Sequence, residues 1–474
     1  MTELSAEQQR LLAARLGGTK PARRPEKPPD IPRHDADAPP LSAGQQALLF
    51  EYHRRSDEPV YTVSYSYWIE GPFDADRFIE ALRIVVMAHE PLHTGFGSDR
   101  RVLTVEEALK VEQVQLDEAA FAATAERRAK RRVDIEHGPL VHALVGQLAG
   151  DRHGVVLTMH HISCDAGSLA AFWADLNVAY RGEELPERAV CYADHAVWQR
   201  SRVTDDDLQH WIEQLGAEPE VAELSFARPS AGTLNGYVRR QLTVNDAEVG
   251  ALGTRPFPLF LAAYGVLLQH LGDVAEPTVG VVASTRDHPD TEPLVGYFLA
   301  VLPFRLPVGS STFRCLVDAV ETLSAAGLAR RHVPFAQIVQ RLRDRKIVTD
   351  LAHTMFVFDE VHEPQLDGVR IESRVHSNGT AVAPITLFVR RWGAGWEVAL
   401  EFDGSELDET SAKLFLDCFD IALSKLLANP DQPVNALNFS DGQASELDMI
   451  GQPVTAPVLP LCELIVDHGD TQPL

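Results

Sequence analysis

One stretch of the sequence constrains the fold more than any other: an apolar, β-branched run that ends in two histidines and is followed by helical periodicity. Residues 155–159 are Val-Val-Leu-Thr-Met, and turn-forming residues occupy 150–154, so the run is predicted to be the second strand of a hairpin begun at 140–148. Beyond Asp165, apolar side chains recur at helical spacing as far as Tyr180. A strand, a short loop and a helix start together make a rigid place to present a side chain.

The chemistry suggested by this loop is proton transfer. His160 and His161 end the strand, and Asp165 follows after three intervening residues. An imidazole with a pKa of about 6.5 can take a proton from an attacking nucleophile at neutral pH. Adjacent residues of an extended chain point to opposite sides, so one histidine is expected to face a cavity and the other to be structural.

Other interpretations of the same residues stay open at this point. The pattern arises by chance in some proteins, with Asp165 serving only as a helix cap. A zinc site is not expected, because two adjacent histidines on a strand do not converge easily on one ion and no Cys-x-x-Cys or His-Glu-x-x-His segment accompanies them. Cys164 is not expected to be a nucleophile, because nothing in the loop would activate its thiol.

Composition bounds the class of protein. The chain has 474 residues, 45% of them hydrophobic, enough for two ordinary domains. Its 43 basic and 68 acidic residues give a net charge of −25, which argues against binding to nucleic acid or to anionic membranes. No apolar run approaches about 18 residues and no signal peptide begins the chain, so we expect a cytoplasmic protein. Five scattered cysteines fit reduced thiols.

The first 40 residues differ from the rest. Residues 4–16 predict a short amphipathic helix, which either docks another polypeptide or is the remnant of an interdomain connection. Residues 19–40 hold seven prolines and many charges and predict a disordered tether. We therefore expect globular structure to begin at Leu41, after a helix and linker over 1–40.

Four segments in order resemble the motifs of one family, the condensation domains of nonribosomal peptide synthetases. They are Leu-Ser-Ala-Gly-Gln-Gln at 41–46, His-Glu-Pro-Leu-His-Thr-Gly-Phe at 89–96, His-His-Ile-Ser-Cys-Asp at 160–165 and Tyr-Ala-Asp-His-Ala-Val-Trp at 192–198. Each segment is weak by itself, but their order makes a strong signal. The resemblance covers about residues 41–440.

Departures from the family pattern raise a question about Asp165. In the family an arginine of the second motif is thought to pair with this aspartate, but here Ala88 and His93 occupy the arginine positions. A buried, unpaired carboxylate costs several kcal/mol, so we expect His93 or Arg305 to take the arginine's place. The signature glycine after the aspartate is Ala166, a milder change.

Later family motifs are also recognisable. Residues 293–303, which include Tyr297, resemble the fifth motif with Leu-Ala-Val in place of Val-Asn-Thr, and 331–335 resemble the sixth. Residues 384–388 and 396–402 predict a hairpin. By resemblance, that region includes the element that crosses between the lobes and closes a substrate tunnel.

The resemblance implies an α/β fold of two chloramphenicol-acetyltransferase-like lobes, a V-shaped pseudo-dimer with the active site at the seam. We expect an N-terminal lobe over 41–215, a C-terminal lobe over 216–440, and a linker over 441–474 that leads towards an adenylation domain. Substrates would arrive as thioesters on the phosphopantetheine arms of donor and acceptor peptidyl carrier proteins. No covalently bound cofactor, metal, nucleic acid or membrane is expected.

The same resemblance assigns roles to the loop residues. His161 would be the general base or would orient the acceptor amine, His160 would support the loop and Asp165 would fix it. Backbone N–H groups at Gly167 and Ser168 would face the developing oxyanion, and Tyr297 would line or support the tunnel. Two alternatives remain: ester formation with a hydroxyl acceptor, and a catalytically silent module that recruits partner enzymes.

Overall fold

The fold is described by a computed structural model over residues 30–34, 40–98, 100–224, 227, 229, 235–309, 311–347, 350–359, 363–393 and 395–438. The predicted helix at 4–16 and the predicted linker at 441–474 lie outside these residues. Within them, no helix is both long and apolar enough to cross a membrane.

The first sheet carries the histidine pair at the end of its central strand. Its strand order is β2-β3-β4-β1-β9. The strands are β1 (Thr62–Glu70), β2 (Leu109–Gln115), β3 (Val141–Gln147), β4 (Arg152–His160) and β9 (Arg370–His376). β3 and β4 are antiparallel, which confirms the predicted hairpin. The polar turn between them leaves the apolar run of β4 buried in the middle of the sheet.

Helices cover both faces of this sheet. α3 (Ala75–Ala88) and α6 (Ala166–Tyr180) pack together and share a core with Ala143 and Val145, whereas α5 (Glu118–Ala129) shares a separate core with Leu144. Since successive side chains of a strand point to opposite faces, α5 lies on the face away from α3 and α6. The periodicity that predicted a helix after Asp165 is thus confirmed by α6.

The second sheet has six strands in the order β5-β11-β10-β8-β6-β7. They are β5 (Gly236–Asn245), β6 (Thr278–Ser284), β7 (Leu299–Arg305), β8 (Thr354–Asp359), β10 (Ile385–Trp392) and β11 (Gly395–Phe402). Their apolar side chains form the largest core with three helices, α10 (Pro256–Gly272), α11 (Phe313–Leu328) and α13 (Glu409–Ala428). The β10–β11 hairpin is as predicted.

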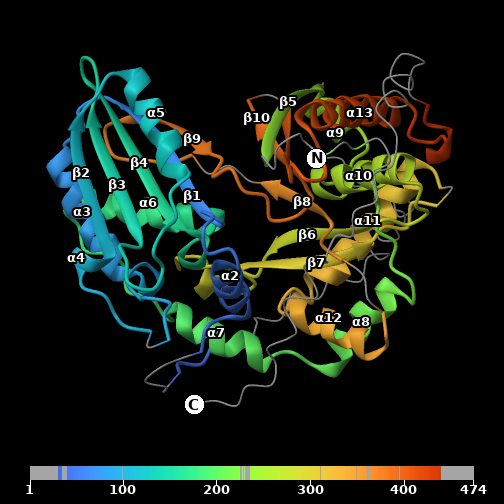
Figure 1. Cartoon of the computed structure of the whole chain (residues 1–474), viewed down its shortest axis with the longest axis horizontal. Helices are drawn as coiled ribbons and strands as arrows, with labels where there is room; N and C mark the ends of the chain where they lie inside the picture. Colours follow the sequence, from blue (N-terminus) through green and yellow to red (C-terminus); the bar gives the residue numbers. More distant parts are fainter. Residues whose placement is uncertain are drawn as a thin grey trace, which may run out of the picture.

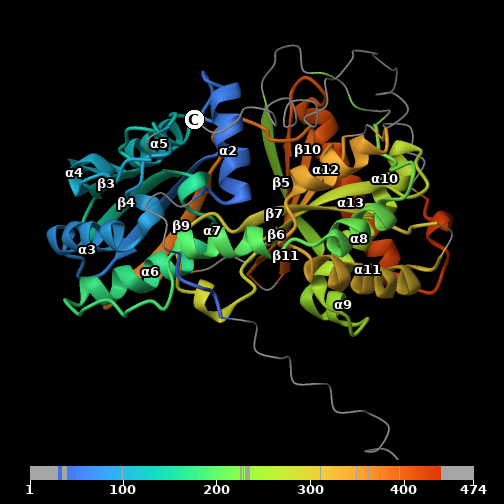
Figure 2. The same cartoon turned by 90° about the horizontal axis from the view of Figure 1, so that it is seen from below.

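Shorter elements complete the fold. These are α2 (Ala43–Arg54), α4 (Val105–Ala108), α7 (Tyr192–Ser201), α8 (Asp205–Leu215), α9 (Asp246–Gly250), α12 (Phe335–Asp344), η1 (Glu90–Leu92), η2 (His161–Ser163), η3 (Pro289–Thr291) and η4 (Val434–Ala436). Figure 1 shows the two sheets in two lobes, with α2 and α7 between them, and Figure 2 gives the same arrangement from below. The expected two-lobed α/β architecture is confirmed.

Two elements cross the expected division at residue 215. β9 comes from the second half of the chain but pairs with β1 in the first sheet, and it is visible as the orange strand beside β1 in Figure 1. The crossing element is therefore β9, not the β10–β11 hairpin, which stays in the second sheet. In the other direction, α8 lies before residue 216 but contributes Trp211 to the core of the second lobe. The boundary itself stays a prediction.

Replacing Trp211 tests the placement of α8. Its side chain is fully buried and its ring lies 5.6 Å from that of Phe304 on β7. We expect Trp211→Ala to lower the free energy of unfolding by about 3–5 kcal/mol, because the truncation leaves a cavity in the core. Urea denaturation measures the change. Trp392→Ala is the matched control, since Trp392 is 48% exposed, and a similar loss in both variants would contradict the assignment.

Candidate functional site

The loop after β4 holds the two histidines on opposite sides. β4 ends at His160, a single 3₁₀ turn covers His161–Ser163, and α6 begins at Ala166 with Asp165 as its N-cap. The cap forms because the Asp165 carboxylate accepts the Ser168 N–H at 2.7 Å. The sharp change from strand to turn separates the environments of the two imidazoles.

His160 is the buried member of the pair. Its side chain is packed edge-on against the rings of Tyr52 and Tyr61, and its Nδ1 accepts the Ile162 N–H at 3.0 Å. Burial, with a smaller contribution from His161, lowers the pKa of His160 to about 3. It is therefore neutral at pH 7 and its observed contacts are those of a supporting residue.

His161 is held in one tautomer. Its Nδ1 lies 3.0 Å from the Cys164 carbonyl oxygen, and because a carbonyl can only accept, Nδ1 must carry the hydrogen. Nε2 then keeps its lone pair. Burial lowers the pKa of His161, an effect that the hydrogen bond to Cys164 partly opposes. A neutral imidazole with a free acceptor nitrogen is the form that a general base requires.

Tyrosines surround this imidazole. The Tyr61 ring centroid lies 6.4 Å and the Tyr297 ring centroid 6.1 Å from that of His161. The Tyr61 carbonyl accepts the His161 N–H at 2.8 Å. Tyr61 has a positive φ of 58°, which is uncommon for a bulky residue and marks a conformation held by its surroundings.

Asp165 pairs with an arginine that the sequence argument did not name. Its Oδ1 accepts from Ser168 Oγ at 2.6 Å and from Arg286 Nη2 at 3.3 Å, and its Oδ2 accepts the Phe298 N–H at 2.8 Å. The side chains of Asp165 and Arg286 are 1% and 6% exposed. The buried carboxylate thus has its cation and its hydrogen bonds, as desolvation requires.

The prediction that His93 or Arg305 pairs with Asp165 was wrong. His93 Nδ1 lies 3.1 Å from the Val86 carbonyl, and Arg305 pairs with Glu276 at 2.9 Å. Arg286 lies two residues after the end of β6, at the seam with the first lobe, and its guanidinium lies 3.8 Å from the centre of the Phe298 ring. An arginine just after a buried strand was a signal in the sequence, but its pairing with Asp165 depends on how the lobes meet.

Ser168 joins the two lobes. Its hydroxyl lies 2.6 Å from the Gly296 carbonyl oxygen and accepts the Gly296 N–H at 3.0 Å. Because the Ser168 N–H is committed to Asp165, it does not point at an oxyanion, contrary to expectation. A Cβ at Gly167 would lie 3.2 Å from Arg286 Nε, so the absence of a side chain there leaves room for the guanidinium. An oxyanion role for the Gly167 N–H stays a prediction.

The first and fourth sequence motifs support the loop from outside. Gln45 Nε2 of α2 donates to the Ile162 carbonyl at 3.2 Å. Tyr192 of α7 places its hydroxyl 2.9 Å from the Ser42 hydroxyl and donates to the Tyr297 carbonyl at 2.6 Å. Segments far apart in the sequence therefore converge on the loop that carries the two histidines.

Two further sets of titratable residues bear on the chemistry of this region. Burial raises the pKa of Glu401 on β11 to about 7, and the negative charge of this carboxylate adds to the rise in the pKa of Tyr61. Among the described residues, His34, Cys191 and Asp194 place possible metal ligands within 4.8 Å of one another. Asp194 lies in the first turn of α7, and its two oxygens already accept the His34 N–H and the Cys191 N–H, each at 2.8 Å. A helix N-terminus repels a cation, so we assign no metal there.

Comparison with known proteins places the chain in a family. The model of the condensation domain family matches residues 35–447. The chain belongs to the condensation domain family.

Curated relatives are peptide synthetases. Tyrocidine synthase 3 of Brevibacillus parabrevis is 27% identical over 82% of this chain, which spans 6% of that protein. Phosphinothricin tripeptide synthetase PhsC of Streptomyces viridochromogenes is 30% identical over 75% of this chain, which spans 36% of its length. The chain thus corresponds to a small part of each relative.

Solved structures establish the fold. The X-domain from teicoplanin biosynthesis matches with a TM-score of 0.75 at 20% identity. The match covers 87% of this chain and 100% of the X-domain. The first condensation domain of the CDA synthetase has a TM-score of 0.69 at 18% identity, with 84% of this chain covering 98% of it.

Removing Arg286 tests its role as the partner of Asp165. We expect Arg286→Ala to lower the free energy of unfolding by about 3–5 kcal/mol, because it leaves a buried carboxylate without its cation. Chemical denaturation at pH 7 measures this. The control is Arg305→Ala, which breaks a partly exposed pair and is expected to cost at most about 1 kcal/mol. A larger loss in the Arg305 variant would restore the first assignment.

Proposed function

We propose that this chain forms an amide bond between two carrier-bound substrates. The acceptor amine attacks the carbonyl carbon of a donor acyl or peptidyl thioester, a C–N bond forms and the C–S bond breaks. His161 takes the proton from the attacking nitrogen, and the thiolate leaving group takes up a proton. The observation that carries the proposal is the hydrogen bond from His161 Nδ1 to Cys164, which leaves Nε2 as the acceptor.

The chain offers no covalent nucleophile at this position. Burial raises the pKa of the Cys164 thiol, and its Sγ lies 3.8 Å from the His160 carbonyl. A thioester is already activated, so the enzyme's contribution is positioning, worth up to about 7–11 kcal/mol, together with proton transfer. The Asp165–Arg286 pair supplies the rigid support that positioning needs.

Donor and acceptor peptidyl carrier proteins, with their phosphopantetheine arms, are the partners of this proposal, and an adjacent adenylation domain is a further one. These partners are supported by the relatives of the chain, which are large peptide synthetases. A cytoplasmic location belongs to the same proposal.

A second candidate is a silent recruitment module. One structural neighbour, the X-domain from teicoplanin biosynthesis, has been solved as a complex with OxyB. Ala88 and Ala166 also depart from the family motifs. Ester formation with a hydroxyl acceptor is a variant of the first candidate, since the proton transfer is the same.

Loss of His161 should abolish transfer. With donor and acceptor on separate carrier proteins, we expect His161→Ala to reduce product formation at least about 100-fold, because general-base catalysis contributes that much. Mass spectrometry of the acceptor carrier measures the product, and an added hydroxyl acceptor reveals ester formation. His137→Ala, at an exposed histidine, is the control. A native chain that binds carriers or partner enzymes but transfers nothing would favour the recruitment module.

The pH dependence of transfer should follow the protonation of His161. Its lowered pKa means that Nε2 is unprotonated at pH 7 and becomes protonated only as the pH falls below about 6.5. We therefore expect the acid limb of kcat/KM to have its midpoint below about 6.5, and activity to be lost on the acid side. The acceptor in this assay carries a weakly basic nitrogen that stays neutral throughout the range. A midpoint above that value would contradict the assigned base.

A further inference from the structure

A run of cations stands out in this acidic chain. Residues 127–132 are Arg-Arg-Ala-Lys-Arg-Arg, five positive charges within six residues of a protein with a net charge of −25. The run begins in the last turn of α5 and continues past its end at Ala129. Cations in a last helical turn are stabilised by the helix dipole, which accounts for Arg127 and Arg128 but not for residues beyond the helix.

All but one of the arginines in this run have a clear structural role. Arg128 pairs with Glu112 at 2.6 Å, and Arg127 donates to the Thr124 hydroxyl at 2.8 Å. Arg132 donates to the Tyr52 carbonyl at 2.9 Å and covers the Tyr52 ring at 3.6 Å. For the exposed Arg131, no acidic group among the described residues lies within ion-pair distance.

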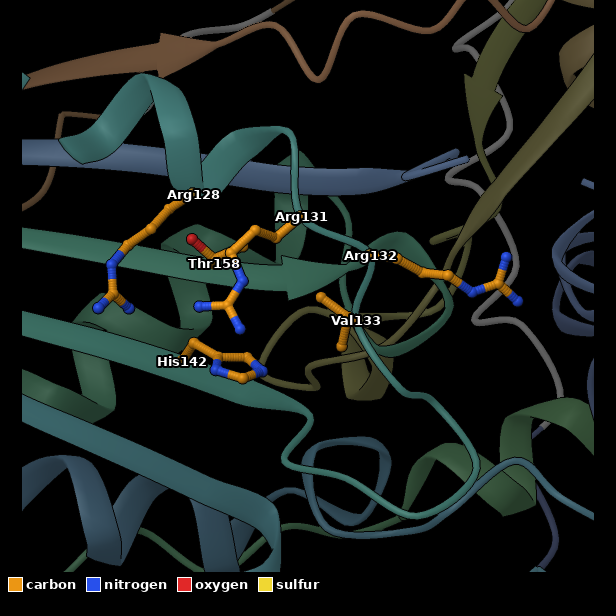
Figure 3. Close-up of a pocket in the computed structure, with 6 residues that line it drawn as sticks. All are labelled: Arg128, Arg131, Arg132, Val133, His142 and Thr158. Carbon is orange, nitrogen blue, oxygen red and sulfur yellow. The ribbon is translucent and has the colours of Figure 1, made fainter. Parts of the chain in front are cut away.

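Arg131 lines a small pocket together with His142. The pocket is lined by Arg128, Arg131, Arg132, Val133, His142 and Thr158. Figure 3 shows the head group of Arg131 above the His142 ring, whereas the head group of Arg132 points away. The pocket is partly open to solvent and has a volume of about 10 Å³, room for one water. A larger anion would therefore lie at its mouth, against the exposed guanidinium.

The charge around this pocket is unbalanced. Burial lowers the pKa of His142 to about 4, and the positive charges of Arg131, Arg128 and Lys110 add to the effect. Glu112 is shared between Arg128 at 2.6 Å and Lys110 at 3.6 Å. A bound anion would supply the missing negative charge.

The pocket is close to the catalytic loop. His142 on β3 pairs with Thr158 on β4, three residues before His161, a separation of about 10 Å along the strand. The backbone is also linked, because the Thr62 hydroxyl donates to the Arg131 carbonyl at 3.2 Å, and the neighbouring Tyr61 packs against His161. Arg131 and His161 are therefore connected through two neighbouring residues, Thr62 and Tyr61.

We infer that Arg131, backed by His142 and Arg128, binds the phosphate of a phosphopantetheine arm. This inference rests on the proposed function and adds to it a residue that determines how the arm is positioned. A guanidinium binds phosphate oxygens through a planar fork of N–H donors. Binding energy at the phosphate, remote from the reacting carbon, places the thioester for attack.

Substrates with and without a phosphate test the inference. The same acyl or aminoacyl group is presented to the native chain and to Arg131→Ala as a 4′-phosphopantetheine thioester and as a pantetheine thioester, in which the phosphate is absent. We expect Arg131→Ala to lower kcat/KM about tenfold for the phosphorylated substrate, in the donor or the acceptor position, and to leave the pantetheine substrate unchanged. Arg127→Ala, on the same helix, should change neither.

A spectroscopic readout keeps the test independent of turnover. Phosphopantetheine bound at this site should raise the pKa of His142, measured from its ring resonances by NMR, in the native chain but not in Arg131→Ala. Equal losses for both substrates, no loss for either, or the same pKa rise with inorganic phosphate alone would overturn the inference. If pantetheine substrates still react, those outcomes leave the proposed function standing; a native chain that condenses neither substrate would overturn the proposed function instead.

Discussion

The structure depends on one buried carboxylate. Asp165 caps α6 through Ser168, meets the guanidinium of Arg286 and accepts the Phe298 N–H. Two of these partners come from the second half of the chain. Because each donor removed would leave a desolvated negative charge, the two lobes are fixed to one another at the same atoms that fix the loop of His161. The same interactions therefore hold the two lobes together and fix the position of the His161 loop.

Local sequence predicted the elements around the site well. The strand, the histidine loop and the helix after Asp165 follow from alternation, turn residues and a capping side chain, which act over a few residues. The tautomer of His161 could not be predicted from the sequence, because it depends on the position of the Cys164 carbonyl after the 3₁₀ turn has formed. Family resemblance supplied the two-lobed architecture, which periodicity alone did not.

Pairings between residues far apart in the chain could not be predicted from the sequence. The sequence offered two cations as partners of Asp165: His93, within the motif that usually supplies one, and Arg305 on β7. The residue that meets it, Arg286, is separated by 121 positions and reaches the carboxylate only because β6 ends at the seam. Similarly, no local pattern shows that β9 joins the sheet of the other lobe. Pairings of this kind are determined by topology.

The strand β9 also determines how the chain can be divided. β1 pairs with β4 on one side and with β9 on the other, so a polypeptide that ended before residue 370 would leave one side of β1 with open backbone donors and acceptors. Exposed strands of this kind recruit other strands and promote aggregation. The first lobe is thus not a portable unit, and a transfer of this domain into another protein has to keep both of its lobes together.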